Sequence, residues 1–127
     1  MMKLLKLISK ASLLVLLLSL TGCYYDETSD EISLPPVANV SFANDIQPIF
    51  NTSCTSCHNG SQVPNLIAGV SYNVINNGTY IVANNLIASS LYQSLIGNEN
   101  LMPIGNPLPA TKINLVKSWI EQGAKNN

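Results

Sequence analysis

Cys54-Thr55-Ser56-Cys57-His58 is the stretch from which the organisation of this 127-residue chain can be worked out. It is a Cys-x-x-Cys-His motif, and its histidine is the only one in the sequence. Two thiols at this spacing can each form a thioether with a porphyrin vinyl group, and the imidazole that follows can ligate the iron. The motif therefore predicts one covalent c-type haem, attached through Cys54 and Cys57, with His58 as the proximal ligand.

The first 22 residues have the pattern of a secretory signal. Three lysines precede a short apolar run over Ala11–Leu20, which is too short to span a bilayer stably. The run ends in Leu20-Thr21-Gly22-Cys23, which resembles the lipobox of bacterial lipoproteins, where cleavage leaves an acylated cysteine as the first residue. We therefore expect residues 1–22 to be a lipoprotein signal peptide and Cys23 to carry the lipid. The alternative is an ordinary signal peptide followed by an incidental cysteine.

Export and acylation predict where the chain resides. The expected place is the cell envelope of a Gram-negative-type bacterium, on the periplasmic or surface side, with two or three acyl chains holding Cys23 in a lipid bilayer. The cleaved chain keeps three lysines and no arginine against seven carboxylates, a net charge of −4. Nucleic acid is therefore not an expected partner.

Other kinds of site also use cysteines at this spacing. Zinc fits poorly, because Cys54, Cys57 and His58 supply three ligands and structural zinc usually takes four; Cys23 is the sole other Cys or His. A thioredoxin-type dithiol is the stronger alternative, but such motifs begin a helix after a strand, and no strand pattern precedes Cys54. A plain structural disulfide between the two cysteines also stays open.

The cleaved chain divides into a tether and one small domain. Residues 23–40 contain four acidic residues and Pro35-Pro36 with few large apolar groups, which indicates an extended tether. Its acidic residues either solvate the segment or act as a surface-export address of the kind some lipoproteins carry. Residues 41–127 are enough for a single domain.

The first helix of this domain is expected to open at Asn44-Asp45-Ile46-Gln47-Pro48. Asn44 would be the N-cap, Gln47 would take the capping-box position, and Pro48 would lie in the first turn, where its missing N–H costs least. Ile46, Ile49 and Phe50 then fall on one face of the helix.

Three further segments have helical spacing. Pro109 suits the first position of a helix that carries an amphipathic stretch over residues 112–122, which Gly123 is placed to end in a left-handed conformation. Ser90–Ile96 is a shorter candidate and Val70–Ile75 a weaker one. Because no convincing alternating strand pattern occurs, the sequence predicts an all-α fold of three to four helices and long loops around one covalent haem.

Met102 is the candidate for the second axial ligand of the iron. It is the one methionine that remains after the signal peptide, and Pro103 biases it away from helix, towards a loop that can cross a haem face. His/Met is the ligand set of cytochromes c. The alternative is a core methionine that fills a gap, in which case a lysine or an asparagine amide could substitute weakly as ligand.

In order and spacing, these residues resemble the class I cytochrome c domain, in particular its short single-haem forms. The pattern spans nearly all of residues 41–125 and consists of Phe42; Asp45, Ile46, Gln47, Pro48, Ile49 and Phe50; Cys54, Cys57 and His58; Ser90 and Tyr92; Met102 and Pro103; and Trp119, Ile120, Gly123 and Ala124.

The resemblance implies a fold and a set of site residues. It implies that the first and last helices cross with Phe50 near Trp119 and Ile120, that His58 and Met102 both ligate the iron, and that the activity is electron transfer. The chain departs from the family in having no arginine to pair with haem propionates. The backbone carbonyl that should accept the second N–H of the imidazole is expected within residues 64–66.

The expected function is that of a membrane-anchored one-electron carrier rather than an enzyme, with membrane redox proteins as donor and acceptor. Two protein ligands on the iron leave no position for a substrate. One alternative is a haem peroxidase or gas sensor in which Met102 dissociates. The other is a haem-free binding lipoprotein stabilised by a disulfide between Cys54 and Cys57.

Overall fold

A computed structural model of the chain describes residues 34–127. The predicted signal peptide, Cys23 and most of the predicted tether lie outside the described residues. The described part is helical and contains no strand, which confirms the all-α prediction for these residues. Its elements are the π-helix η1 (Phe42–Ile46) and the α-helices α2 (Gln47–Ser53), α3 (Ser71–Ile75), α4 (Ser90–Ile96) and α5 (Ala110–Glu121).

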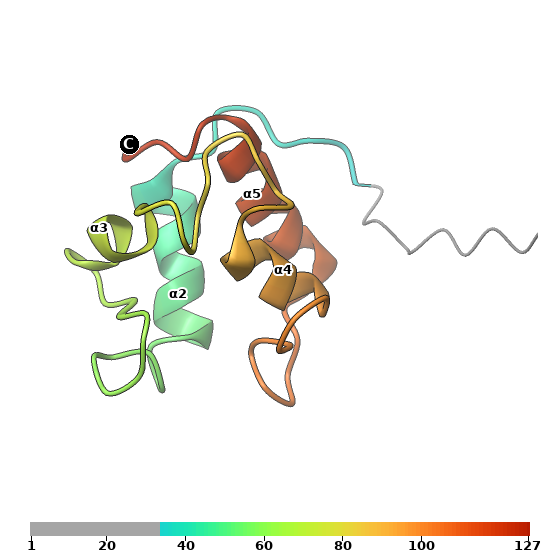
Figure 1. Cartoon of the computed structure of the whole chain (residues 1–127). Coiled ribbons are helices and arrows are strands. Elements are labelled where there is room, and N and C mark those ends of the chain that lie inside the picture. Colours follow the sequence, from blue (N-terminus) through green and yellow to red (C-terminus); the bar gives the residue numbers. More distant parts are fainter. Residues whose placement is uncertain (1–33) are drawn as a thin grey trace, which may run out of the picture. The chain divides into compact units, whose positions relative to one another are not determined.

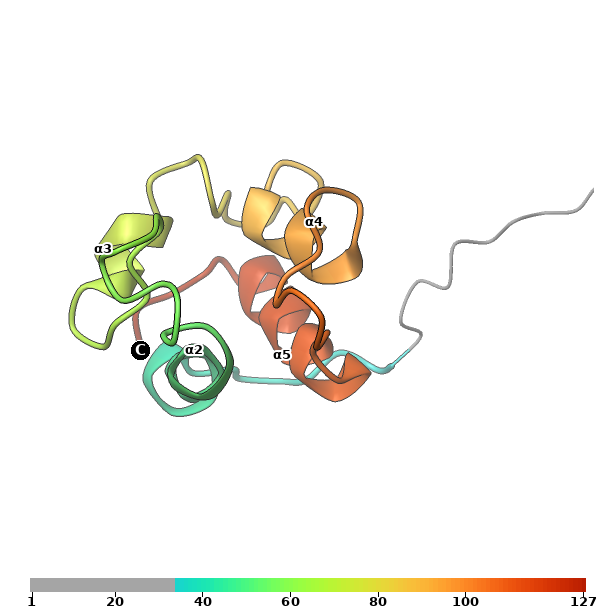
Figure 2. The ribbon, with the colours of Figure 1, turned by 90° about the horizontal axis from the view of Figure 1, so that it is seen from below.

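The helices form two groups with long loops between them. α2 and α3 lie on one side and α4 and α5 on the other, and the chain between α3 and α4 crosses from one side to the other (Figures 1 and 2). The loops that follow α2 and α4 extend to the same end of the helices (Figure 1). Two loops far apart in the sequence therefore lie at the same end of the fold (Figure 1).

The first helix begins earlier than predicted, because Ser41 rather than Asn44 is its N-cap. The Ser41 side chain accepts a hydrogen bond from the backbone N–H of Asn44 at 3.2 Å, and Asp45 Oδ2 accepts one from the N–H of Ser41 at 2.8 Å. This reciprocal pair is a capping box that is one residue wider than usual, since η1 is a π-turn. Pro48 does lie in the first turn of α2, as predicted. The Gln47 side chain does not form the predicted capping box, because it bonds Asn51, Leu66 and Ser71 instead.

The last residue of the chain also caps η1. The N–H of Phe42 donates to Asn127 Oδ1 at 2.9 Å, and the N–H of Ala43 donates to the Asn127 carbonyl oxygen at 2.9 Å. These are donors that a helix N-terminus leaves without intrahelical partners. The two ends of the domain are thereby joined at η1.

The other helices follow the predictions closely. α4 spans Ser90–Ile96 as predicted, and α3 begins one residue after the predicted Val70. α5 starts directly after Pro109, which is its N-cap rather than its first residue as predicted. Gly123, with a φ of 93°, ends the helix in the left-handed conformation that favours glycine.

The hydrophobic core lies where η1 packs on α5. The ring of Phe42 is central to it, with its centroid 5.1 Å from that of Tyr72, 5.4 Å from that of Trp119 and 6.2 Å from that of Phe50. α4 packs on α5 as well. The first and last helical elements therefore do pack together, and Phe42 rather than Phe50 supplies the aromatic contact with Trp119.

A segment assigned to the tether, residues 35–40, lies along α5. Asn114 Nδ2 donates to the Pro35 carbonyl oxygen at 2.9 Å, and the N–H of Val37 donates to Ser118 Oγ at 3.0 Å. Gln122 completes the row, because its side chain accepts from the N–H of Val40 at 3.0 Å and donates to the Val37 carbonyl oxygen. The three polar residues are spaced four apart on α5, so they form one stripe along the helix.

The Gln122→Ala variant should lower the free energy of unfolding by about 1–2 kcal/mol, because the N–H of Val40 and the Val37 carbonyl oxygen both lose their partner. Urea unfolding followed by circular dichroism would measure this change. Glu121→Ala is the matched control, since Glu121 is exposed on the same turn, and a change within about 0.5 kcal/mol is expected. Equal effects of the two substitutions would contradict the role given to Gln122.

Candidate haem-binding site

A cavity of about 430 Å³ lies between the two groups of helices. This volume is within the range of pockets that bind small molecules and cofactors. Most of its lining is apolar, with residues from α2, from α4, from α5 and from the two loops described above: Ile49, Phe50, Val63, Pro64, Leu66, Leu91, Leu95, Pro103, Ile104, Leu108 and Val116.

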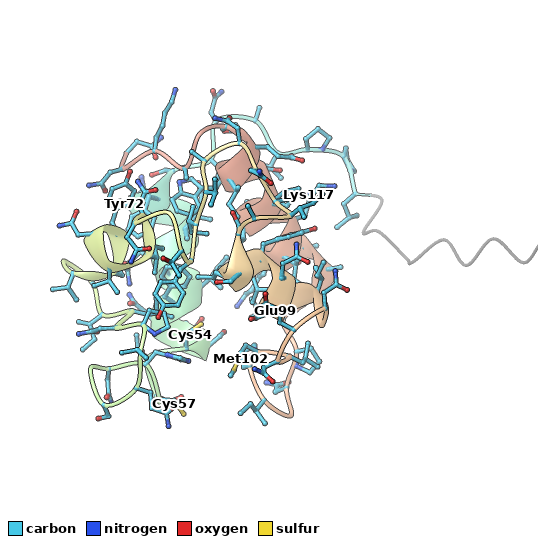
Figure 3. All side chains as sticks on the ribbon, viewed as in Figure 1. Cys54, Cys57, Tyr72, Glu99, Met102 and Lys117 are labelled. Carbon is cyan, nitrogen blue, oxygen red and sulfur yellow. The ribbon has the colours of Figure 1, made fainter. Side chains whose placement is uncertain are left out.

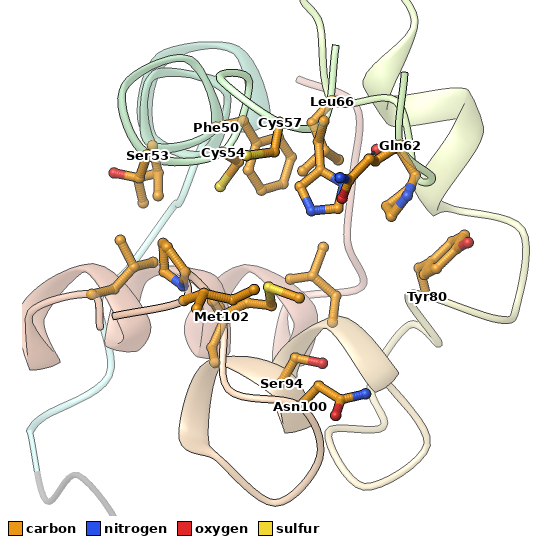
Figure 4. A pocket seen from close by; sticks show the side chains of 18 of the residues that line it. Phe50, Ser53, Cys54, Cys57, Gln62, Leu66, Tyr80, Ser94, Asn100 and Met102 are labelled. Carbon is orange, nitrogen blue, oxygen red and sulfur yellow. Dashed lines mark hydrogen bonds between the residues drawn. The ribbon is translucent and has the colours of Figure 1, made fainter. Parts of the chain in front are cut away.

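All four residues predicted to hold a haem line this cavity: Cys54, Cys57, His58 and Met102. Cys54 and Cys57 lie on the α2 side and Met102 lies on the other side of the gap (Figures 3 and 4). The fold therefore brings together one methionine and a Cys-x-x-Cys-His motif that are far apart in the sequence.

The motif forms a single turn at the C-terminal end of α2. Cys54 caps the helix, with its N–H donating to the Phe50 carbonyl oxygen at 2.9 Å. The Cys54 carbonyl oxygen accepts from the N–H of Cys57 at 3.1 Å and from that of His58 at 2.9 Å. This turn directs both cysteines and the histidine to the same cavity. The two cysteines form no disulfide with each other in this structure.

The His58 ring is oriented by a backbone carbonyl. Its Nδ1 lies 3.1 Å from the carbonyl oxygen of Pro64, which is within the region expected from the sequence. Because a carbonyl oxygen can only accept, Nδ1 carries a proton, and in the neutral imidazole Nε2 is then the nitrogen with the lone pair. A neutral imidazole in this tautomer is prepared to ligate a metal through Nε2.

Met102 is held in place by its own backbone. Its N–H donates to the Ser94 carbonyl oxygen at 3.0 Å, which ties the loop between α4 and α5 to α4. The residue lies outside any helix, as Pro103 predicted, and it is half-buried and not among the residues of the hydrophobic core. This position differs from that of a methionine that fills a gap in the core.

The two thiols have different surroundings. Burial raises the pKa of the Cys54 thiol to about 11, although the positive charge of Lys112 acts in the opposite direction. Cys57 is exposed. Cys54 differs in this respect from the reactive thiol of a thioredoxin-type dithiol, which lies at a helix N-terminus and has a depressed pKa.

Cys57 should therefore be alkylated by iodoacetamide faster than Cys54 in haem-free protein at pH 8, because Cys54 is less accessible and has less thiolate than an ordinary thiol. Mass spectrometry of peptides from a time course would assign the two rates. In a denaturant the rates should converge. If Cys54 reacted first in the folded protein, the placement of the two thiols would be wrong.

Several polar residues at the cavity are not evident from the sequence. Gln62, Tyr80, Ser94, Glu99 and Asn100 line it. Two other polar aromatic side chains have backbone partners: the Tyr72 hydroxyl donates to the Ala124 carbonyl oxygen, and Trp119 Nε1 donates to that of Lys125. Tyr80, by contrast, lines the cavity. It lies in a loop, so no helical spacing in the sequence could predict this position.

Within residues 34–127, no group of three or more His, Cys, Asp or Glu side chains is arranged to hold a metal ion. None of the helices in this part of the chain is long and apolar enough to cross a membrane.

No protein-family model matches the chain, and the searches of curated proteins and of solved structures find no significant similarity to it.

Proposed function

We propose that this protein is a membrane-anchored one-electron carrier with one covalently attached haem c, built on a domain similar to class I cytochromes c. The observation that carries the proposal is the shared cavity of Cys54, Cys57, His58 and Met102. Cys54, Cys57 and His58 belong to one motif, so the informative point is that Met102, which is far away in sequence, lines the same cavity.

The residues present fit a haem. Cys54 and Cys57 would form the thioethers, and the free Nε2 of His58 would ligate the iron from the α2 side. Met102 would ligate it from the opposite side (Figure 4). The apolar lining supplies contact area for a porphyrin, which a domain of this size needs to complete its core. The bound haem would supply a one-electron iron couple.

Ligation by both His58 and Met102 favours a carrier over a catalyst. With both axial positions occupied by side chains, a substrate has no place on the iron. A thioether ligand also raises the reduction potential relative to a second histidine. The chain has no second histidine and no arginine that could assist peroxide cleavage.

The environment of the two thiols disfavours the dithiol alternative. Cys54 lies at the C-terminal end of α2, where the helix dipole opposes a thiolate, and burial opposes it further. A redox-active dithiol needs a stabilised thiolate. Thioether formation needs only that the reduced thiols reach the vinyl groups, and both cysteines line the cavity.

Acylation of Cys23 would hold the domain at a membrane of the cell envelope. Residues 35–40 lie along α5, so the anchor would join the domain beside this helix. Membrane redox proteins would then be the donor and acceptor, because tethering to a shared surface raises their effective concentration.

The test is the absorption spectrum of the purified full-length protein. The reduced pyridine haemochrome should have the bands of haem c, and the oxidised protein should have the far-red band of Met–iron ligation. A protein without haem would refute the proposal and favour the disulfide-stabilised binding lipoprotein. Haem without the far-red band, together with binding of carbon monoxide, would favour the peroxidase or gas sensor.

A further inference from the structure

Gln47 is a buried polar residue whose hydrogen bonds reach the loop that carries His58. It is 8% exposed, and its Nε2 donates to the Leu66 carbonyl oxygen at 3.0 Å and to Asn51 Oδ1 at 2.9 Å. Its Oε1 accepts a hydrogen bond from Ser71 Oγ. Both donor hydrogens of the amide are thus used, and the side chain joins α2, the loop after it and α3.

Leu66 connects Gln47 to His58. The N–H of Leu66 donates to the His58 carbonyl oxygen at 2.8 Å, while its own carbonyl oxygen accepts from Gln47. Two residues earlier, the Pro64 carbonyl oxygen faces His58 Nδ1 at 3.1 Å. The hydrogen bonds on both sides of Leu66 therefore hold the segment that carries the Pro64 carbonyl oxygen, the partner of the His58 ring.

We propose that Gln47 is a positioning residue for His58, which fixes the loop segment of residues 64–66 so that the imidazole keeps its Nδ1 hydrogen bond and presents Nε2 to the cavity. The role rests on the proposed function, since it concerns His58 as an iron ligand. A glutamine suits the position because the Leu66 carbonyl oxygen needs a donor and Ser71 Oγ needs an acceptor, and one amide supplies both. An apolar side chain of the same size would leave both groups buried without partners.

The experiment compares three variants of the full-length haem protein. Gln47→Met keeps the size of the side chain and removes its hydrogen bonds. Asn51→Ala and Ser71→Ala are the matched controls, because each removes one partner of Gln47 and leaves the bond to Leu66 in place. The two measurements are hydrogen exchange of the His58 Nδ1–H by NMR in the reduced protein and the reduction potential by spectroelectrochemistry.

In Gln47→Met, the His58 Nδ1–H should exchange about two- to tenfold faster, the range expected for loss of one hydrogen bond. The reduction potential should rise, because a weaker bond to Pro64 makes the imidazole a poorer donor to ferric iron. Both controls should keep the wild-type values. If Gln47→Met does not retain haem, Gln47→Glu decides by the same measurements, since a carboxylate still accepts from Ser71 but cannot donate to Leu66.

Two results would overturn the inference in distinguishable ways. Wild-type exchange and potential in the haem-bearing Gln47 variant, or equal changes in all three variants, would leave Gln47 with a structural role only and would not affect the proposed function. A wild-type protein without covalent haem would refute the proposed function, and the role of Gln47 with it.

Discussion

Replacing Cys54 and Cys57 together with alanine should remove all covalently bound haem from the protein. Among residues 34–127 they are the only thiols at the cavity, and each can form one thioether. Haem-dependent staining of a denaturing gel measures this directly, because denaturation releases haem that is bound only by ligation. The protein would be produced in a bacterium with a c-type haem maturation system, and the signal would be normalised to the amount of polypeptide.

The single variants distinguish the two attachment points. Cys54→Ala and Cys57→Ala should each reduce the covalent haem strongly, because a single thioether remains in either case. Ser56→Ala is the control within the motif: its side chain lies between the two cysteines in sequence and also lines the cavity, yet it forms no bond to a vinyl group. Full staining of the double variant would show that the cysteines do not attach the haem.

Loss of the haem should also weaken the fold. The cavity of about 430 Å³ lies between the α2 side and the α4 and α5 side of a small domain. A filled cavity gives these residues contacts that an empty one lacks. We therefore expect the double variant to unfold at a lower temperature than the Ser56→Ala protein, as followed by circular dichroism.

Local patterns in the sequence predicted the helices well where apolar spacing and end signals agree. Ser90–Ile96 is the clearest example, with Leu91, Tyr92 and Leu95 at helical spacing and Gly97 in the left-handed conformation directly after it. The motif likewise forms one turn that brings Cys54 and His58 to the same cavity. Both results depend on residues that are close in sequence.

The start of the first helix could not be predicted in the same way. Asn44 and Ser41 are both good N-caps, and the choice between them depends on the π-turn and on Asn127, which satisfies two further N–H groups of η1. The packing of residues 35–40 along α5 could not be predicted from the sequence either. Asn114, Ser118 and Gln122 look like ordinary polar residues of a helix until the segment that they bind is known.

At the candidate site, the residue types were enough to predict which side chains could hold a haem, whereas their arrangement in space was known only from the fold. Elimination favoured Met102 as the partner for His58, because the other two methionines, Met1 and Met2, lie in the segment that is expected to be cleaved. The sequence could not place Met102 across a cavity from the motif, since that depends on how α4 and α5 pack. Gln47 was assigned to a cap for the same reason: its partners, Leu66 and Ser71, are distant in sequence.

Met102→Ala should abolish the far-red band of the oxidised protein and lower its reduction potential. In the described part of the chain, Met102 is the only sulfur-containing residue on its side of the cavity, and its replacement would remove the proposed ligand that favours ferrous iron. We expect a shift on the order of a few tenths of a volt, within the span of about 0.8 V that axial ligands cover in haem proteins. Met102→His should keep a six-coordinate iron but also lower the potential.

Ile104→Ala is the matched control for this prediction, because Ile104 lies on the same loop, lines the same cavity and is 82% exposed, yet offers no ligand atom. Its far-red band should be unchanged. A Met102→Ala protein that kept the band would show that another residue ligates the iron. The same variant also addresses the choice between carrier and catalyst: if wild-type protein already behaved like Met102→Ala in binding carbon monoxide, the iron would have an open position, and a gas sensor or peroxidase would be the better description.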